Sequence, residues 1–231
     1  MINNVLASEL AAQHNRDLRT HAEAFRRTRA ARSASGRPTS AEQVMRAGRA
    51  ATARLGGVHI RPLRPTDQAL VRNVFDHLSP RSRWLRFLGP KSALTDTELS
   101  YFTAVDHHDH EALVAISRFG GRPLAVARYV RSRDDSGSAD VAIAVIDSWQ
   151  RLGVGRMLAM QLAARARCEG VHRFSALISA DNRGAKSLLA TLGTVRVRER
   201  AAGTVHYEVA LTADKPVAGG FRASPALAGC A

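Results

Sequence analysis

The chain has 231 residues, which suits one ordinary domain with extensions, and 45% of them are hydrophobic, which is enough for a packed core. The formal net charge of +14 comes almost entirely from arginine, and it favours anionic partners such as phosphates or acidic surfaces without choosing among them. No run approaches the roughly 18 apolar residues of a membrane span, so we expect no membrane segment.

The first quarter of the chain differs in composition from the rest. Residues 1–57 hold ten arginines, no lysine, four acidic residues and almost no aromatic residues. This composition predicts a basic Ala/Arg-rich extension that is flexible or partly helical. Nucleic acid is not the expected partner, because single strands are held largely by stacking on interleaved aromatic side chains.

Targeting and redox features favour a cytoplasmic location. The start of the chain lacks the basic segment and long apolar run of a secretory signal. Cys168 and Cys230 are too few to build a disulfide framework, so a reducing compartment is expected.

Regular patterning begins at Val58 and predicts one α/β (α+β) domain over 58–211, followed by a loose tail over 212–231. Strands are predicted at 58–63, 112–117, 123–130, 139–146, 174–179, 195–197 and 205–209. Helices are predicted at 67–78 after Thr66, from Pro80, from Thr95 or Asp96 to Phe102, at 153–169, and at 181–192 after Asp181. The strand–helix–strand unit over 139–179 should be a right-handed parallel crossover, and the hairpins beside it make the sheet mixed.

The turn between the strand at 139–146 and the next helix has the features of an anion site. Gly153 and Gly155 remove side chains where the backbone must tighten and approach a ligand. The first N–H groups of the helix lack partners, and together with the helix dipole they attract anions. Arg151 and Arg156 add positive charge. The turn lacks the third glycine of a dinucleotide fingerprint and the Gly-Lys pair of a P-loop, so a pyrophosphate held in another way is the natural occupant.

Gln150 to Gly155 matches the Q/R-x-x-G-x-G/A pattern of the GNAT superfamily of acetyl-CoA-dependent N-acetyltransferases, and the residues from 182 to 193 resemble that family's closing N-x-x-A…G pattern. The resemblance covers about 58–211. It implies a mixed central sheet with splayed parallel strands flanked by helices, and acetyl-CoA as the co-substrate. It also implies a set of cofactor-binding residues, namely Ala144, Val145, Gln150, Arg151, Leu152, Gly153, Val154, Gly155, Arg156 and Asn182.

A finer resemblance concerns the acceptor. The segments 79–87, 94–106 and 139–150 are similar to bacterial protein lysine acetyltransferases, in which an acidic residue opens the strand before the CoA motif. Asp140 occupies that position, and the resemblance implies that it is the general base. A lysine ammonium has a pKa of about 10.4 and must lose a proton before it attacks a thioester. The alternative is a strand-edge aspartate that faces solvent or pairs with Arg128 or Arg131.

Two features leave other functions open. Many members of the family carry a tyrosine that protonates the leaving thiolate, whereas Leu189 stands at that position here and cannot donate a proton. With the shorter acid Asp140, this allows a non-catalytic acyl-CoA-binding regulatory module. A small-molecule amine acetyltransferase is the other alternative, although polycationic amines suit an acidic site better than this basic domain.

No metal is expected. The run Asp106 to Glu111 contains three histidines, but its residues are too close in sequence to surround one ion without a special loop. We expect a solvated loop there. The expected partners of the domain are acetyl-CoA and an amine acceptor, plausibly a protein lysine.

Overall fold

A computed structural model of the protein describes residues 57–201 and 203–212. The extension predicted over 1–57 and the tail predicted over 212–231 therefore lie, apart from Gly57 and Thr212, outside the described residues. Within the described ranges, no helix combines the length and the apolar character that crossing a membrane would require.

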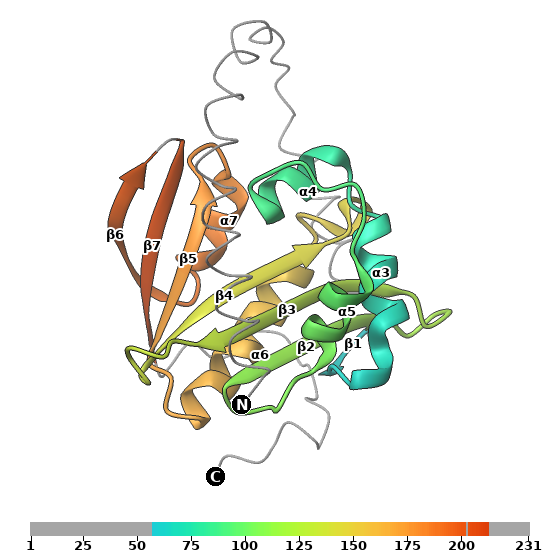
Figure 1. The fold of residues 1–231 in the computed structure, drawn as a ribbon, viewed down its shortest axis with the longest axis horizontal. Coiled ribbons are helices and arrows are strands. Elements are labelled where there is room, and N and C mark those ends of the chain that lie inside the picture. The colour runs from blue at the N-terminus through green and yellow to red at the C-terminus, as the bar shows by residue number, and fades with distance from the viewer. Residues whose placement is uncertain (1–56, 202, 213–231) are drawn as a thin grey trace, which may run out of the picture.

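Seven strands form one sheet in the order β1-β2-β3-β4-β5-β7-β6 (Figure 1). The strands are β1 Val58–Pro62, β2 His110–Ser117, β3 Pro123–Arg131, β4 Ser138–Val145, β5 Arg173–Ser179, β6 Gly193–Ala201 and β7 Thr204–Leu211. All neighbours are antiparallel except β4 and β5, which are parallel. The predicted mixed sheet with a parallel crossover is confirmed.

The parallel strands β4 and β5 stay together at one end only. Their registered pairs are limited to 138–140 with 173–175, whereas β4 pairs with β3 along 139–145. Beyond Asp140 the two strands diverge, as Figure 1 shows. The far half of β4 therefore presents backbone groups without a β5 partner to the gap, which is the splayed arrangement that the sequence predicted.

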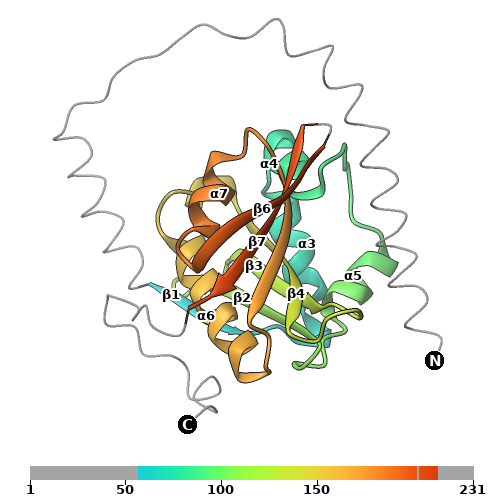
Figure 2. The same ribbon diagram turned by 90° about the vertical axis from the view of Figure 1, so that its left-hand side faces the viewer.

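Helices cover both faces of the sheet (Figure 2). The turn η2 Pro65–Asp67 leads into α3 Gln68–Asp76, and α3 lies with α4 Pro80–Phe87 and α5 Asp96–Thr103 on one face; η3 Asp147–Trp149 follows β4, and α6 Val154–Cys168 and α7 Arg183–Leu189 lie on the other face. Because both faces are covered, the strands bury side chains on two sides. Leu158 and Leu162 of α6 belong to one core with Phe174, whereas Phe75 and Leu99 belong to a second core on the opposite face.

Helix boundaries follow local hydrogen bonding. Thr95, one of the two predicted candidates, caps α5, because its hydroxyl oxygen accepts from the backbone N–H of Glu98 at 3.2 Å. The prediction that Thr66 begins a helix over 67–78 is wrong. Pro65 starts a 3-10 turn, and Asp67 accepts from the Arg64 N–H at 2.8 Å, which delays α3 to Gln68.

The last helix also begins and ends differently from the prediction. Asn182, and not Asp181, is its cap: the Asn182 side-chain oxygen accepts from the Ala185 N–H at 3.0 Å. The helix ends at Leu189, three residues before the predicted end. The following strand then begins at Gly193, where a Cβ would lie 1.8 Å from the Ala210 carbonyl oxygen, so only glycine permits this close approach of β6 to β7.

Candidate functional site

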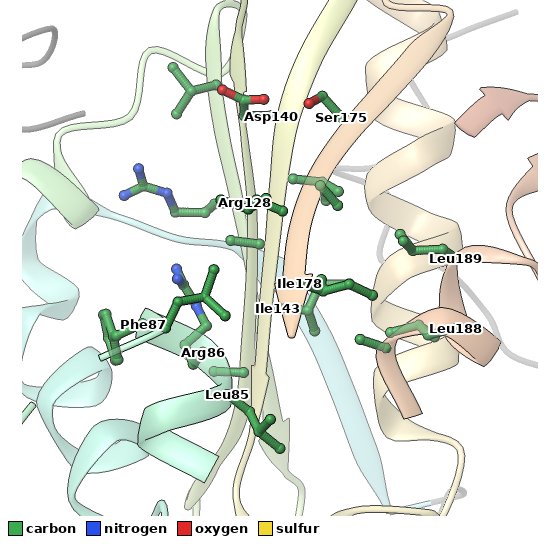
Figure 3. Close-up of a pocket in the computed structure, with 18 of the residues that line it drawn as sticks. Leu85, Arg86, Phe87, Arg128, Asp140, Ile143, Ser175, Ile178, Leu188 and Leu189 are labelled. Atoms are coloured by element: carbon green, nitrogen blue, oxygen red, sulfur yellow. The ribbon is translucent and has the colours of Figure 1, made fainter. Parts of the chain in front are cut away.

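A cleft of about 2630 Å³ follows the divergence of β4 and β5. Its walls come from α4, α5, β3, β4, β5, α7 and the turn before α6, so it opens on both faces of the sheet. Figure 3 shows Ile143 of β4 and Ile178 of β5 inside it, with Arg86 of α4 on one side and Leu188 of α7 on the other. Its volume exceeds the roughly 1,000 Å³ of a large small-molecule pocket, and it therefore leaves room for two substrates.

The turn before α6 forms the first wall. Arg151 and Gly153 have positive φ angles of 60° and 89°, which bend the backbone sharply and leave the first N–H groups of the 15-residue helix α6 without intrahelical partners. Together with the dipole of α6, these groups attract an anion. A Cβ at Gly155 would lie 3.3 Å from Cγ2 of Val145, so this glycine lets α6 approach β4 closely.

The structure places most of the predicted cofactor residues on the cleft, but not all. Those that line it are Ala144, Val145, Gln150, Arg151, Gly153, Gly155, Arg156 and Asn182. Val154 is fully buried in the core beneath the turn, and Leu152 is not among the lining residues. Any contact of Val154 with a ligand would therefore come from its backbone. Glycines, positive φ angles and the unpaired edge of β4 fit the pyrophosphate and the extended arm of a CoA thioester.

A hydrogen-bonded group connects the turn to α4. Asp147 accepts from the backbone N–H of Ser79 at 2.8 Å and from the hydroxyls of Ser79 and Ser82 at 2.7 and 2.9 Å. Although burial opposes it, these hydrogen bonds hold the pKa of Asp147 below its usual value. Gln150 donates to the Ser82 hydroxyl at 3.1 Å and to the Val145 carbonyl at 3.0 Å. We call Ser79, Ser82, Asp147 and Gln150 the α4 latch.

Asp140 lies where β4 and β5 part, on the face covered by α3, α4 and α5. It is exposed, and its registered partners are Val130 of β3 and Ser175 of β5. Figure 3 shows the Asp140 and Ser175 side chains pointing toward each other across the top of the cleft. Ser175 is in turn hydrogen-bonded to Nε2 of His206 at 2.6 Å. The sequence did not single out Ser175 or His206, because no local motif links residues 31 positions apart.

Two arginines on the same face were also missed as site residues. Arg86 and Arg128 both line the cleft (Figure 3). Burial lowers the pKa of Arg128, and Tyr101 and Asp140 offset part of that effect. Burial and then the charge of Arg128 lower the pKa of Arg86 to about 9. The sequence shows only two arginines among many, and their proximity depends on the packing of α4 against the sheet.

The histidine-rich loop pairs its side chains with carboxylates. His107 Nδ1 lies 2.7 Å from Glu111, which is fully buried and also accepts from Arg165 Nε at 3.0 Å. His108 Nδ1 lies 2.6 Å from Glu169 at the end of α6. Among residues 57–201 and 203–212, no three His, Cys, Asp or Glu side chains converge as ligands of an ion. These contacts fix the loop to α6, and Asp106, His108, Asp109 and His110 line one end of the cleft.

The fold and the cleft define a class of protein, and comparison with known proteins identifies it. The family model described as the acetyltransferase (GNAT) family matches residues 75–194, which is more than half of the chain. The protein therefore belongs to the GNAT family and is an acetyltransferase that uses acetyl-CoA. The leucine at position 189 does not make it a non-catalytic member.

Individual relatives sharpen the comparison. The chain is 31% identical over 144 residues to an acetyltransferase of Pseudomonas aeruginosa, covering 62% of this chain and 77% of that one. It is 33% identical over 141 residues to the acetyltransferase Pat of Mycolicibacterium smegmatis, covering 61% of this chain but only 42% of that protein. Much of the Mycolicibacterium protein therefore has no counterpart in this alignment.

Solved structures show the same fold. The GNAT domain of S. lividans PAT superposes with a TM-score of 0.62 at 29% identity, covering 68% of this chain and 93% of that one. An acetyltransferase from Salmonella typhimurium, solved with its cofactor acetyl-CoA, superposes with a TM-score of 0.55 at 20% identity, covering 68% of this chain and 96% of that one. The second likeness supports the fold alone.

Proposed function

We propose that the protein is a protein lysine acetyltransferase that transfers the acetyl group of acetyl-CoA directly to a lysine Nζ. The observation that carries the proposal is the divergence of β4 and β5 with Asp140 at its closed end. It leaves one face of the cleft for the donor and the other for an acceptor. The identities of 33% to Pat of Mycolicibacterium smegmatis and 29% to the PAT domain of S. lividans favour a protein acceptor.

The protein would hold acetyl-CoA mainly through backbone groups of α6 and β4. The N–H groups at the start of α6, flanked by Arg151 and Arg156, would bind the pyrophosphate. The edge of β4 at Ala144 and Val145 would pair with the extended arm as an added strand does. Acetyl-CoA supplies the activated acyl group, and a backbone N–H near Val145 would stabilise negative charge on its carbonyl oxygen.

Asp140 would act on the acceptor. Its carboxylate accepts the proton that the lysine ammonium must lose, directly or through one water, because the lysine nitrogen attacks only when it is neutral. The N–C bond then forms as the C–S bond breaks, and the thiolate leaves. Leu188 and Leu189 on the far wall cannot protonate it. Ser175, hydrogen-bonded to His206 on the same face as Asp140, is the group we propose as a proton relay: its hydroxyl gives a proton to the thiolate and takes up the second proton that the acylated nitrogen loses.

Titration of the purified protein with acetyl-CoA, followed by mass spectrometry of a cell lysate treated with isotopically labelled acetyl-CoA, tests the proposal. We expect saturable binding and labelled lysines on proteins. Labelled small amines without labelled proteins would replace the lysine acceptor with a small-molecule one. Failure to bind acetyl-CoA would remove the proposal altogether.

A further inference from the structure

Arg86 and Arg128 bring two positive charges together on the acceptor face of the cleft. Arg128 lies in the middle of β3, and its registered partner on β4 is Ala142, two residues from Asp140. Arg86 lies in the last turn of α4, which covers this face. Figure 3 shows both side chains on the α4 side of β4. They are close enough that the charge of Arg128 lowers the pKa of Arg86.

Neither arginine forms an ion pair with a carboxylate within the described part of the chain, although the charge of Asp140 acts on Arg128 from a distance. Nη1 of Arg128 is buried without a hydrogen-bond partner. Their contacts are instead aromatic. The Arg128 guanidinium lies 4.7 Å from the ring centres of Tyr101 and Phe102, and that of Arg86 lies 5.0 Å from the ring of Phe87.

This arrangement is costly unless an anion neutralises it. A desolvated cation without a partner destabilises a fold, and two such cations repel each other as well. Arg86, with a pKa of about 9, remains charged at neutral pH. The guanidinium groups lie over aromatic rings, and a guanidinium can bind a planar carboxylate through two parallel hydrogen bonds. By contrast, Arg131, which also lines the cleft, is paired with the carboxylate of Asp109 at 2.6 Å.

We propose that Arg86 and Arg128 form a carboxylate-binding subsite, so that the preferred acceptor carries a carboxylate close to the amine that is acetylated. The inference rests on the proposed function, since it names the acceptor of that same site. Arg128 and Asp140 are diagonal neighbours on the same face, and such residues lie roughly 7–8 Å apart with their Cβ atoms somewhat closer. An amine at Asp140 and a carboxylate at the two arginines therefore fit within one short acceptor.

The carboxylate has two sources. It belongs either to an acidic residue beside the target lysine or to an amino acid whose own amine is acetylated. The same two positive charges would repel a polyamine or an aminoglycoside, which have no anionic group. The subsite thus separates carboxylate-bearing acceptors from polycationic ones.

Two matched acceptor pairs test the subsite with the full chain. The first pair is a blocked peptide with a Glu-Lys sequence and the same peptide with Gln-Lys, and the second is L-leucine and L-leucinamide. We expect kcat/KM of the native protein to be about tenfold or more higher for the carboxylate-bearing member of one pair, mainly through KM, since hydrogen bonds to charged groups are the stronger ones. The pair that shows the preference identifies the source of the carboxylate.

Three variants complete the test. Arg86→Gln and Arg128→Gln should each reduce the preference to within about twofold of unity, whereas Arg122→Gln, an exposed arginine outside the cleft, should keep it. Thermal unfolding of each variant checks the fold, and Arg86→Gln decides the matter if Arg128→Gln unfolds. Equal kcat/KM for both members of both pairs, or a preference that survives in the folded variants, would overturn the subsite.

Calorimetric titration of the CoA-saturated protein with both acceptor pairs separates this inference from the proposed function. If no acceptor is acetylated, the proposed transfer fails. Tighter binding of the carboxylate-bearing member of either pair, lost in Arg86→Gln, would then still support the subsite, and equal binding within both pairs would overturn it.

Discussion

The two walls of the cleft are built from different parts of the chain. The donor wall is made mostly of backbone: the turn with positive φ at Arg151 and Gly153, the start of α6 and the unpaired edge of β4. The acceptor wall is made of side chains, with Asp140, Arg86 and Arg128 projecting from three different elements.

This difference separates what every member of such a family must share from what each can vary. A backbone wall recognises a constant ligand, and its chemistry depends on glycines and on dihedral angles. A side-chain wall can change with single substitutions while the sheet stays the same. The first three predictions below test whether the two walls act independently, and the fourth concerns the pH dependence of stability on the acceptor face.

The largest effect should follow from Asp140→Ala. Without the carboxylate the lysine ammonium loses its proton acceptor, and kcat should fall roughly 100-fold or more. The Kd for acetyl-CoA should stay within about twofold, because Asp140 is not on the donor wall. Steady-state rates and calorimetric titration measure the two quantities.

Asp76→Ala, an exposed aspartate at the end of α3, is the matched control and should change neither quantity. Ser175→Ala removes only the hydroxyl that bonds to His206, so its kcat should fall less, by about tenfold. A weaker acetyl-CoA affinity in Asp140→Ala would show that the walls are coupled at the closed end of the cleft.

Gly155→Val should weaken acetyl-CoA binding and leave the acceptor preference unchanged, which is the converse of Asp140→Ala. Even a Cβ at Gly155 would lie only 3.3 Å from Cγ2 of Val145, so the larger valine side chain must push α6 away from β4. Overpacking of this kind costs about 1–3 kcal/mol, and if the bound state bears this cost, acetyl-CoA binding weakens by roughly 5- to 150-fold. The variant should still show the carboxylate preference in whatever turnover remains.

Gly89→Ala serves as the control for Gly155→Val, because a Cβ at Gly89 meets no heavy atom closer than 4.0 Å. Both affinities are obtained from the same calorimetric titration. Unchanged acetyl-CoA affinity in Gly155→Val would mean that the donor is not held against this turn.

Asp147→Ala should affect both walls by a smaller amount. The substitution removes three hydrogen bonds that join the turn to α4. At about 1 kcal/mol for the net loss, KM for acetyl-CoA and KM for the acceptor should each rise by about fivefold. Initial rates with each substrate varied in turn measure this, and an effect on one KM alone would mean that the α4 latch does not join the walls.

The smallest effect at neutral pH should follow from substituting His110, which lies on the acceptor face beside Tyr101 and affects the free energy of unfolding mainly at acidic pH. Burial, and then the charge of Arg128, lower the pKa of His110 to about 4. The unfolded chain binds this proton more readily, so stability is full above pH 6.5 and is lost as the pH falls from 6.5 toward 4, by up to roughly 3 kcal/mol.

His110→Asn should flatten this part of the stability profile, measured by urea unfolding between pH 4 and 7.5. His172→Asn, at an exposed histidine, should leave the slope in place. An unchanged slope in His110→Asn would place the pH dependence elsewhere in the fold.

Most of the cofactor residues predicted from the sequence line the cleft, whereas on the proposed acceptor wall the sequence singled out only Asp140. The residues of the Gln150–Gly155 turn are contiguous, and their glycines have a direct backbone consequence. Arg86, Arg128 and His206 come together only when α4 packs on the sheet and β7 lies beside β5. No periodicity in the chain reveals such contacts between distant residues.

Element ends show the same limit on a smaller scale. The sequence left the cap of α5 open between Thr95 and Asp96, and the structure has Thr95, with Glu98 completing the capping box. At the start of the last helix the sequence predicted Asp181, and the neighbouring Asn182 is the cap instead. The choice went to Asn182 because Asp181 turns instead toward Ser179 and Arg81.

The α4 latch also works as a spacer. Asp147 and Gln150 join the turn that would hold the phosphates to the helix that carries Arg86, at the other end of the acceptor wall. A shift of the turn therefore carries α4 with it, and the span from pyrophosphate to acceptor carboxylate stays constant. The hydrogen bonds of Asp147 and Gln150 would therefore set the distance between the proposed pyrophosphate site and the proposed carboxylate subsite.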